Sequence, residues 1–176
     1  MFANHTWEIF WGMQRQMWWY HTGLVATHPY TSSWRSWPLL LRPIWLYTSG
    51  EQAGTIANIY AFGNPMVFWG GLVSVIFSVF YALSEKRKNL LYIVGAYFGV
   101  FVPWALSPRI MFLYHYFPAV PFLCIATGVF LYKNKKIIPA FFLISIVLFI
   151  YFYPHLTGIS VPTVLNESYF WFESLR

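Results

Sequence analysis

The sequence contains no aspartate, one cysteine and few charges of either sign, and these shortages exclude several kinds of protein. Only 9% of its 176 residues are charged, whereas soluble domains carry about 25%, so water is not expected to be the main solvent. Cys124 has no second cysteine with which to form a disulfide, so cysteine usage does not indicate a redox compartment. What is abundant is apolar: 59% of the residues are hydrophobic.

The positive charges do not have the distribution of a nucleic-acid-binding protein. The formal net charge is +6, and all lysines fall in two short clusters, at 86–88 and 133–136, which separate apolar runs. A nucleic-acid-binding protein instead gathers its cations on one accessible surface. We therefore expect no nucleic-acid partner.

Four long apolar segments predict the fold class. They are residues 64–83, 89–106, 110–132 and 137–154. Segments of about 18 to 23 residues cross a hydrocarbon core about 30 Å thick when helical, and the short connections require antiparallel neighbours. We expect an all-α integral membrane protein with a four-helix bundle over 64–154, an extracytoplasmic segment 1–63 and an extracytoplasmic tail 155–176.

The orientation follows from the turns between these segments. The first and third turns, SEKRK and KNKK, each carry three cations, while the middle turn SPR carries one. Cytoplasmic loops are enriched in lysine and arginine, which places the first and third turns in the cytoplasm. A 63-residue outer segment would then have to cross the membrane first, so we expect earlier spans in a longer protein.

The outer segment has two kinds of pattern. Trp7, Phe10, Trp11 and Trp18 recur at helical spacing, which predicts an amphipathic helix lying in the membrane interface. From His28 the chain is rich in proline, serine and tryptophan, which is typical of an ordered loop. A second short helix is expected near 51–60.

Arginine and aromatic side chains in the outer regions suggest a ligand that carries both phosphate and sugar. The arginine fork donates two parallel hydrogen bonds to phosphate and stays charged, and aromatic faces suit sugar rings. The candidate contacts are Arg42, Arg109, His28, Tyr30, His115, Tyr116 and Trp37. On one continuous helix Arg109 and Tyr116 would share a face and address one cavity.

These residues also have ordinary structural interpretations. Arg109 could anchor a helix end at the membrane surface, and His115 could be a neutral side chain bonded to a neighbouring helix. Loop packing could account for His28, Tyr30 and Arg42. His21 and His28 have no carboxylate or cysteine at ligand spacing, so no metal site is expected.

Two long blocks make the chain recognisable. QRQMWWYHTGLVATHPYTSSWRSWPLLLRPIWLY and SPRIMFLYHYFPAVPFLCIA resemble the C-terminal four-span region of protein O-mannosyltransferases. The resemblance implies part of a GT-C-type glycosyltransferase that moves mannose, with inversion, from polyprenyl (dolichyl) phosphate mannose to Ser or Thr of a protein. It implies no cofactor, and a bacterial cytoplasmic membrane, or the endoplasmic reticulum in a eukaryote.

One departure from the family pattern limits this expectation. The family's catalytic Asp-Glu pair lies in its first outer loop, and this sequence has no aspartate. The chain alone is therefore not expected to catalyse transfer, and a missing amino-terminal half or a second subunit is an expected partner. The alternatives are a transferase that modifies a lipid or glycan, and a non-catalytic subunit that binds polyprenyl phosphate.

Overall fold

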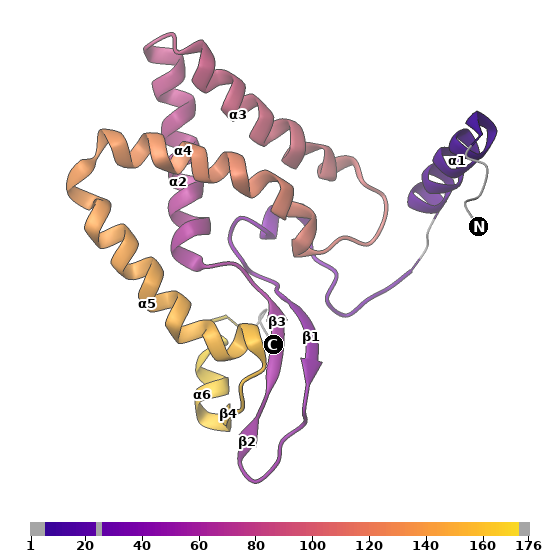
Figure 1. The fold of residues 1–176 in the computed structure, drawn as a ribbon, viewed down its shortest axis with the longest axis vertical. Coiled ribbons are helices and arrows are strands. Elements are labelled where there is room, and N and C mark those ends of the chain that lie inside the picture. Colours follow the sequence, from indigo (N-terminus) through magenta and orange to yellow (C-terminus); the bar gives the residue numbers. More distant parts are fainter. Residues whose placement is uncertain (1–5, 24–25, 173–176) are drawn as a thin grey trace.

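Four long apolar helices form the centre of the fold (Figure 1). The computed structural model describes residues 6–23 and 26–172. The helices are α2 (Pro65–Ser84), α3 (Lys88–Phe101), α4 (Val120–Lys133) and α5 (Ile138–Thr157). With their flanking 3-10 turns, all four are long and apolar enough to cross a membrane. The prediction of four spanning helices is confirmed.

The first of these helices begins at a well-defined cap. The side-chain oxygen of Asn64 accepts hydrogen bonds from the backbone N–H groups of Met66 and Val67, at 3.0 and 3.4 Å. Pro65 follows at the first helical position, where its missing N–H costs nothing. The amide nitrogen of Asn64 donates to the carbonyl oxygen of Ser145 at 2.8 Å, so the cap also fixes α2 against α5.

The third span begins later than the apolar run suggested. Residues 110–112 are not helical, and a 3-10 turn, Leu113–Ala119, leads into α4. Pro118 and Pro121 lack the N–H groups that the interior of an α-helix continuing from residue 110 would use, so the regular helix starts only at Val120. Arg109 therefore precedes the helix, and the expectation that Arg109 and Tyr116 share one helix face is wrong.

Residues 44–61 contain strands where a second helix was expected. β1 (Ile44–Thr48) pairs antiparallel with β3 (Asn58–Ala61), and β2 (Thr55–Ile56) pairs with β4 (Val161–Pro162). Gly50 and Gly54 have φ of 71° and 75°, which a helix does not allow but a turn uses. The expected helix near 51–60 is wrong, and these strands add to a mostly helical fold.

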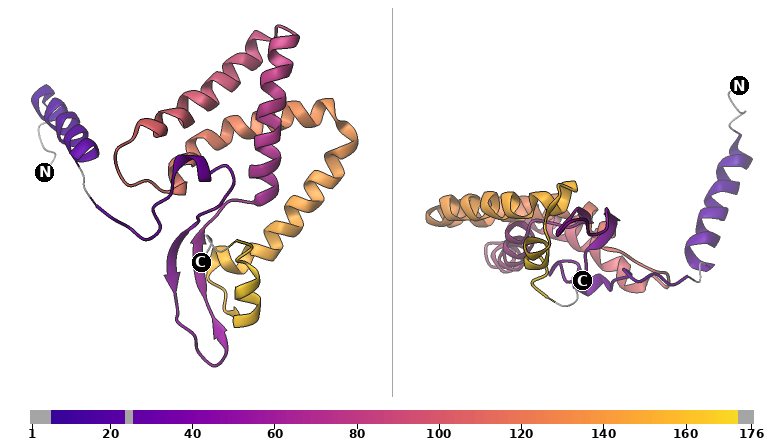
Figure 2. Two further views of the ribbon diagram at one scale, coloured as in Figure 1. Left: turned by 180° about the vertical axis from the view of Figure 1, so that it is seen from behind. Right: turned by 90° about the horizontal axis from the view of Figure 1, so that it is seen from below.

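The amino-terminal helix α1 (Trp7–Gly23) stands apart from the rest of the chain (Figures 1 and 2). None of its residues is buried, and Trp7, Trp18 and Trp19 are each more than 70% exposed. The helix itself was predicted from the aromatic spacing. Its place in a membrane interface stays a prediction.

Two layers of contact hold the remaining elements together. Between the spans, Val75 of α2 and Leu123 and Ala126 of α4 are fully buried. At the end of α5, α6 (Thr163–Ser168) is joined to β3 by Asn58, whose amide nitrogen donates to the side-chain oxygen of buried Asn166 at 2.9 Å. The core thus continues from the bundle into residues 37–44, next to which candidate residues lie.

Candidate functional site

The loop 26–43 is fixed against the segment 107–112, which connects α3 with the third span. The backbone N–H of Ser32 donates to the carbonyl oxygen of Met111 at 2.8 Å, and the Thr31 hydroxyl donates to the same oxygen at 3.2 Å. These bonds join residues 79 and 80 positions apart. They bring both blocks of candidate residues to one place.

A stack of rings fills the junction between these segments. Trp37 is 1% exposed, and its indole N–H donates to the Ser32 hydroxyl at 2.9 Å. Its ring lies parallel to that of His115, with 6.0 Å between centroids. Trp104, at the end of the second span, contacts both rings, at 6.0 Å from Trp37 and 4.4 Å from His115.

His115 is also held by the backbone next to it. Its Nδ1 lies 3.0 Å from the carbonyl oxygen and 3.1 Å from the amide nitrogen of Phe112. Depending on the tautomer, Nδ1 donates to the carbonyl or accepts from the N–H. The structural interpretation of His115, as a side chain held by its neighbours, therefore has direct support.

The two arginines each retain an unpaired donor. Arg42 donates from its terminal nitrogen to the carbonyl oxygen of Pro29 at 2.6 Å, while Arg109 contacts Nδ1 of His21 on α1. Both arginines are half-buried, and the Nε atom of each is buried without a hydrogen-bond partner. Each Nε–H is thus an unsatisfied donor that the surrounding chain covers, and it can bond to an anionic oxygen only if the arginine side chain turns to expose it.

His28 and Tyr30 lie on the exposed side of the same junction. His28 Nδ1 accepts a hydrogen bond from the Tyr30 backbone N–H at 3.1 Å, and its ring lies 5.1 Å from that of Phe112. The Tyr30 ring lies 6.0 Å from that of Trp45 on β1. Six of the seven expected contacts thus lie at this junction. They are called the arginine–aromatic cluster: His28, Tyr30, Trp37, Arg42, Arg109 and His115.

Tyr116 does not belong to this cluster. It is 0% exposed, and its hydroxyl lies 2.8 Å from that of Tyr97 on α3. Its ring packs between those of Phe68 and Phe101. Tyr116 is therefore placed inside the bundle core, where it joins the second and third spans.

Three residues that were not among the seven expected contacts complete the cluster. His21 contacts Arg109, Phe112 lies against both histidines of the cluster, and Trp104 packs on His115. His21 and Phe112 lie inside the two blocks that carried the resemblance, so motif membership was the signal that could have indicated them.

The cluster consists of cationic and aromatic side chains. The described carboxylates belong to other elements: Glu8 to α1, Glu51 to the loop after β1, Glu85 to the turn after α2 and Glu167 to α6. Within residues 6–23 and 26–172, no three His, Cys, Asp or Glu side chains are grouped to hold a metal ion. The cluster suits the binding of an anion beside a sugar or a lipid.

Comparison with known proteins decides the family. The model of the C-terminal four TMM region of protein-O-mannosyltransferase matches residues 6–175. The chain belongs to this family. It corresponds to the four-span C-terminal region of that family, and its four long apolar helices make it an integral membrane protein.

Individual relatives agree with the family match. A polyprenol-phosphate-mannose–protein mannosyltransferase of Corynebacterium glutamicum is 23% identical over 85% of this chain and 33% of the relative. Dolichyl-phosphate-mannose–protein mannosyltransferase 4 of Saccharomyces cerevisiae is 28% identical over 65% of this chain and 17% of the relative. The chain thus spans a third or less of the length of these relatives.

A solved structure shows the same fold. The S. cerevisiae protein O-mannosyltransferase Pmt1-Pmt2 complex bound to the sugar donor matches with a TM-score of 0.81 and 20% identity. The match covers 99% of this chain and 28% of the other. The match therefore includes the part of the chain that carries β1 and β3 as well as the four long helices.

Proposed function

We propose that this chain supplies the lipid-phosphate side of an active site that transfers mannose from polyprenyl (dolichyl) phosphate mannose to Ser or Thr of a protein. Membership of the family supports the reaction. The observation that supports the role of this chain is the pair of half-buried arginines, Arg42 and Arg109, each with an unpartnered Nε. An unsatisfied buried donor costs about 1–3 kcal/mol, and a phosphate oxygen would satisfy it.

The chemistry of the transfer fits this division of roles. When the bond between mannose and phosphate breaks, negative charge grows on the departing lipid phosphate, and nearby guanidinium groups stabilise it. The attacking hydroxyl must lose its proton to a base, for which a carboxylate is suited. The cluster provides the cations, so we propose that the carboxylate comes from another part of the enzyme or from a second subunit.

We further propose a topology in which the cluster faces the outer side of the membrane. Residues 1–63 and 155–176 would lie outside, 64–154 would form the spans, and α1 would lie in the interface. The distribution of charge supports this proposal, because both lysine-rich turns lie at the end of the bundle away from β1 and β3 (Figure 1). The bacterial relative makes a bacterial cytoplasmic membrane the proposed location.

A chimera tests the role of the arginines. Residues 6–172 would replace the corresponding third of the C. glutamicum relative, and mannose transfer to an acceptor peptide would be measured in membranes. Arg42→Ala and Arg109→Ala should each raise the KM for the lipid donor about tenfold or more, since each removes a charged hydrogen-bond donor. Arg35→Ala is the matched control, because Arg35 is exposed and its guanidinium lies over Trp34 instead.

Photo-crosslinking separates binding from catalysis. The chain itself, in membranes, would be exposed to a photoactivatable polyprenyl phosphate, and labelled peptides from the cluster are expected. Unchanged labelling and unchanged donor KM in both arginine variants would contradict the phosphate role. Labelling without turnover in the chimera would favour the non-catalytic binding subunit, and mannose found on a lipid or glycan would favour the other alternative.

A further inference from the structure

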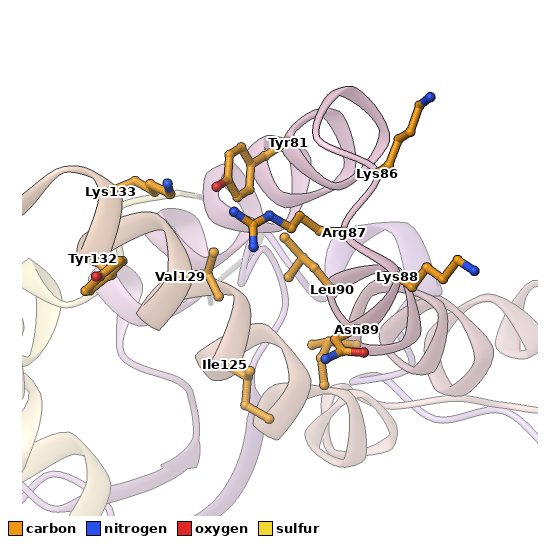
Figure 3. Close-up of a pocket in the computed structure, with 11 residues that line it drawn as sticks. Tyr81, Lys86, Arg87, Lys88, Asn89, Leu90, Ile125, Val129, Tyr132 and Lys133 are labelled. Atoms are coloured by element: carbon orange, nitrogen blue, oxygen red, sulfur yellow. The ribbon is translucent and has the colours of Figure 1, made fainter.

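A cleft with a basic mouth lies at the end of the bundle opposite the arginine–aromatic cluster (Figure 3). Its volume is ≈ 730 Å³, and four cations border it: Lys86, Arg87 and Lys88 from the turn between α2 and α3, and Lys133 from the end of α4. None of the described residues that line the cleft is acidic. The cleft therefore has a net positive charge that no carboxylate of its own offsets.

Two of these cations are directed into the cleft. Figure 3 shows the Arg87 guanidinium turned toward Tyr81, whereas Lys86 and Lys88 point away. The Lys133 ammonium lies 4.8 Å from the centre of the Tyr81 ring. The backbone N–H of Arg87 donates to the carbonyl oxygen of Ala82 at 2.9 Å, which fixes the turn from which the arginine projects.

Below the basic mouth, the wall of the cleft is apolar. Leu90 and Ile93 line it from α3, and Ile125 and Val129 line it from α4. Ile125 and Val129 are four residues apart and so lie on one helix face, extending away from Lys133 into the bundle. A phosphate at the mouth and a hydrocarbon chain along the wall would meet matching surfaces.

We propose that this cleft binds one anionic phospholipid, with its phosphate between Arg87 and Lys133 and one acyl chain along the α3–α4 wall. Basic pockets between spanning helices are suited to anionic headgroups. The charge of the cleft, the inward direction of two cations and the apolar wall together distinguish it from a cluster that only sets topology. A bound lipid would join the first hairpin of spans to the end of the third.

The chain offers a control with the same charge change. Lys135 and Lys136 belong to the same basic turn as Lys133, but they are not among the residues that line the cleft. The double variants Arg87→Gln/Lys133→Gln and Lys135→Gln/Lys136→Gln both remove two positive charges. General attraction to an anionic membrane changes equally in the two, so any difference between them belongs to the cleft.

Native mass spectrometry of the chain in detergent would measure binding of phosphatidylglycerol and phosphatidylcholine. We expect one phosphatidylglycerol per chain, bound more tightly than phosphatidylcholine. Arg87→Gln/Lys133→Gln should weaken phosphatidylglycerol binding about 30-fold, and the control pair should leave it nearly unchanged. The variant Arg87→Lys/Lys133→Arg keeps both charges and should bind like the parent chain.

Several results would overturn the proposal. They are equal affinity for the two lipids, an equal loss in both double variants, or displacement of the lipid by inorganic phosphate at the same concentration. If circular dichroism showed that Arg87→Gln/Lys133→Gln does not fold, a phosphatidylglycerol with a photoreactive headgroup would decide with the parent chain. Labelled peptides must then contain Arg87 or Lys133, and labelling confined to other peptides would reject the site.

Discussion

Replacing Gly71 by alanine should loosen the packing of α2 on α4. A Cβ at this position would lie 2.0 Å from Cδ2 and 2.5 Å from Cγ of Leu123. Leu123 is 0% exposed, so its side chain has no free space into which it could turn. Small residues let spanning helices approach closely, and overpacking of this kind costs about 1–3 kcal/mol.

The loss of stability in Gly71→Ala is best compared with the effect of the same substitution at a second helical glycine. Alanine is favoured over glycine by about 1 kcal/mol within a helix, which partly hides the cost of the clash. Gly99 on α3 has open space around it, so Gly99→Ala gains the helix preference without a clash. The free energy of unfolding of Gly71→Ala should therefore fall about 1–3 kcal/mol below that of Gly99→Ala.

Titration with SDS, followed by circular dichroism, would provide these free energies, and a double-mutant cycle would identify the cause. Leu123→Ala alone leaves a cavity and should cost about 2–5 kcal/mol. In Gly71→Ala/Leu123→Ala the added methyl group enters space that the leucine has left, so the double variant should lose less than the sum of the single losses. Additive losses, or a Gly71→Ala variant as stable as Gly99→Ala, would refute the close approach of the two helices.

The remaining predictions concern topology, alkaline pH and a buried amide pair. In a Cys124→Ser background, an impermeant maleimide should label Gln52→Cys but not Lys136→Cys in intact cells, and the opposite pattern would reverse the proposed orientation. Burial raises the pKa of Tyr60 to about 12, with smaller contributions from Tyr30 and Glu167. The neutral phenol should therefore stabilise the fold below its ordinary pKa of 10.0, and this contribution should disappear as pH rises through about 12. Tyr60→Phe cannot ionise, so at high pH it should unfold less readily than the parent chain, and circular dichroism would follow the unfolding. Asn166→Ala should cost about 1–3 kcal/mol in thermal unfolding, because the amide of Asn58 loses its buried partner; an unchanged melting temperature would contradict this.

The spans could be predicted because one physical constraint determines them. A bilayer requires helices of a certain length without charges, and the four apolar runs satisfy this without information about their neighbours. The pairing of Thr55 and Ile56 with Val161 and Pro162 is different, because the partners lie more than 100 residues apart. Short strands of this kind carry too little periodicity to be separated from a short helix.

The candidate site was predictable in composition but not in geometry. The two blocks that resemble the family contained the residues of the cluster, and side-chain chemistry selected the arginines. Counting along one continuous helix then wrongly placed Arg109 and Tyr116 on the same face. The α-helix of the third span starts later, because Pro118 and Pro121 do not fit the interior of an α-helix. The contact between His21 and Arg109 also depends on tertiary folding across 88 positions.

Both ends of the bundle carry cationic and aromatic side chains, but these side chains are held more firmly at one end than at the other. In the arginine–aromatic cluster, Arg42 is held by the Pro29 carbonyl oxygen and Trp37 by Ser32, so the binding groups are fixed before a ligand arrives. At the opposite end, Arg87 and Lys133 are exposed; the Lys133 ammonium lies over the Tyr81 ring, and the Arg87 guanidinium is turned toward it. Fixed groups lose less entropy on binding and can position a bond that must break. Exposed cations can follow a lipid headgroup that moves with the membrane, and this difference supports the proposed substrate at the first end and the proposed lipid at the second.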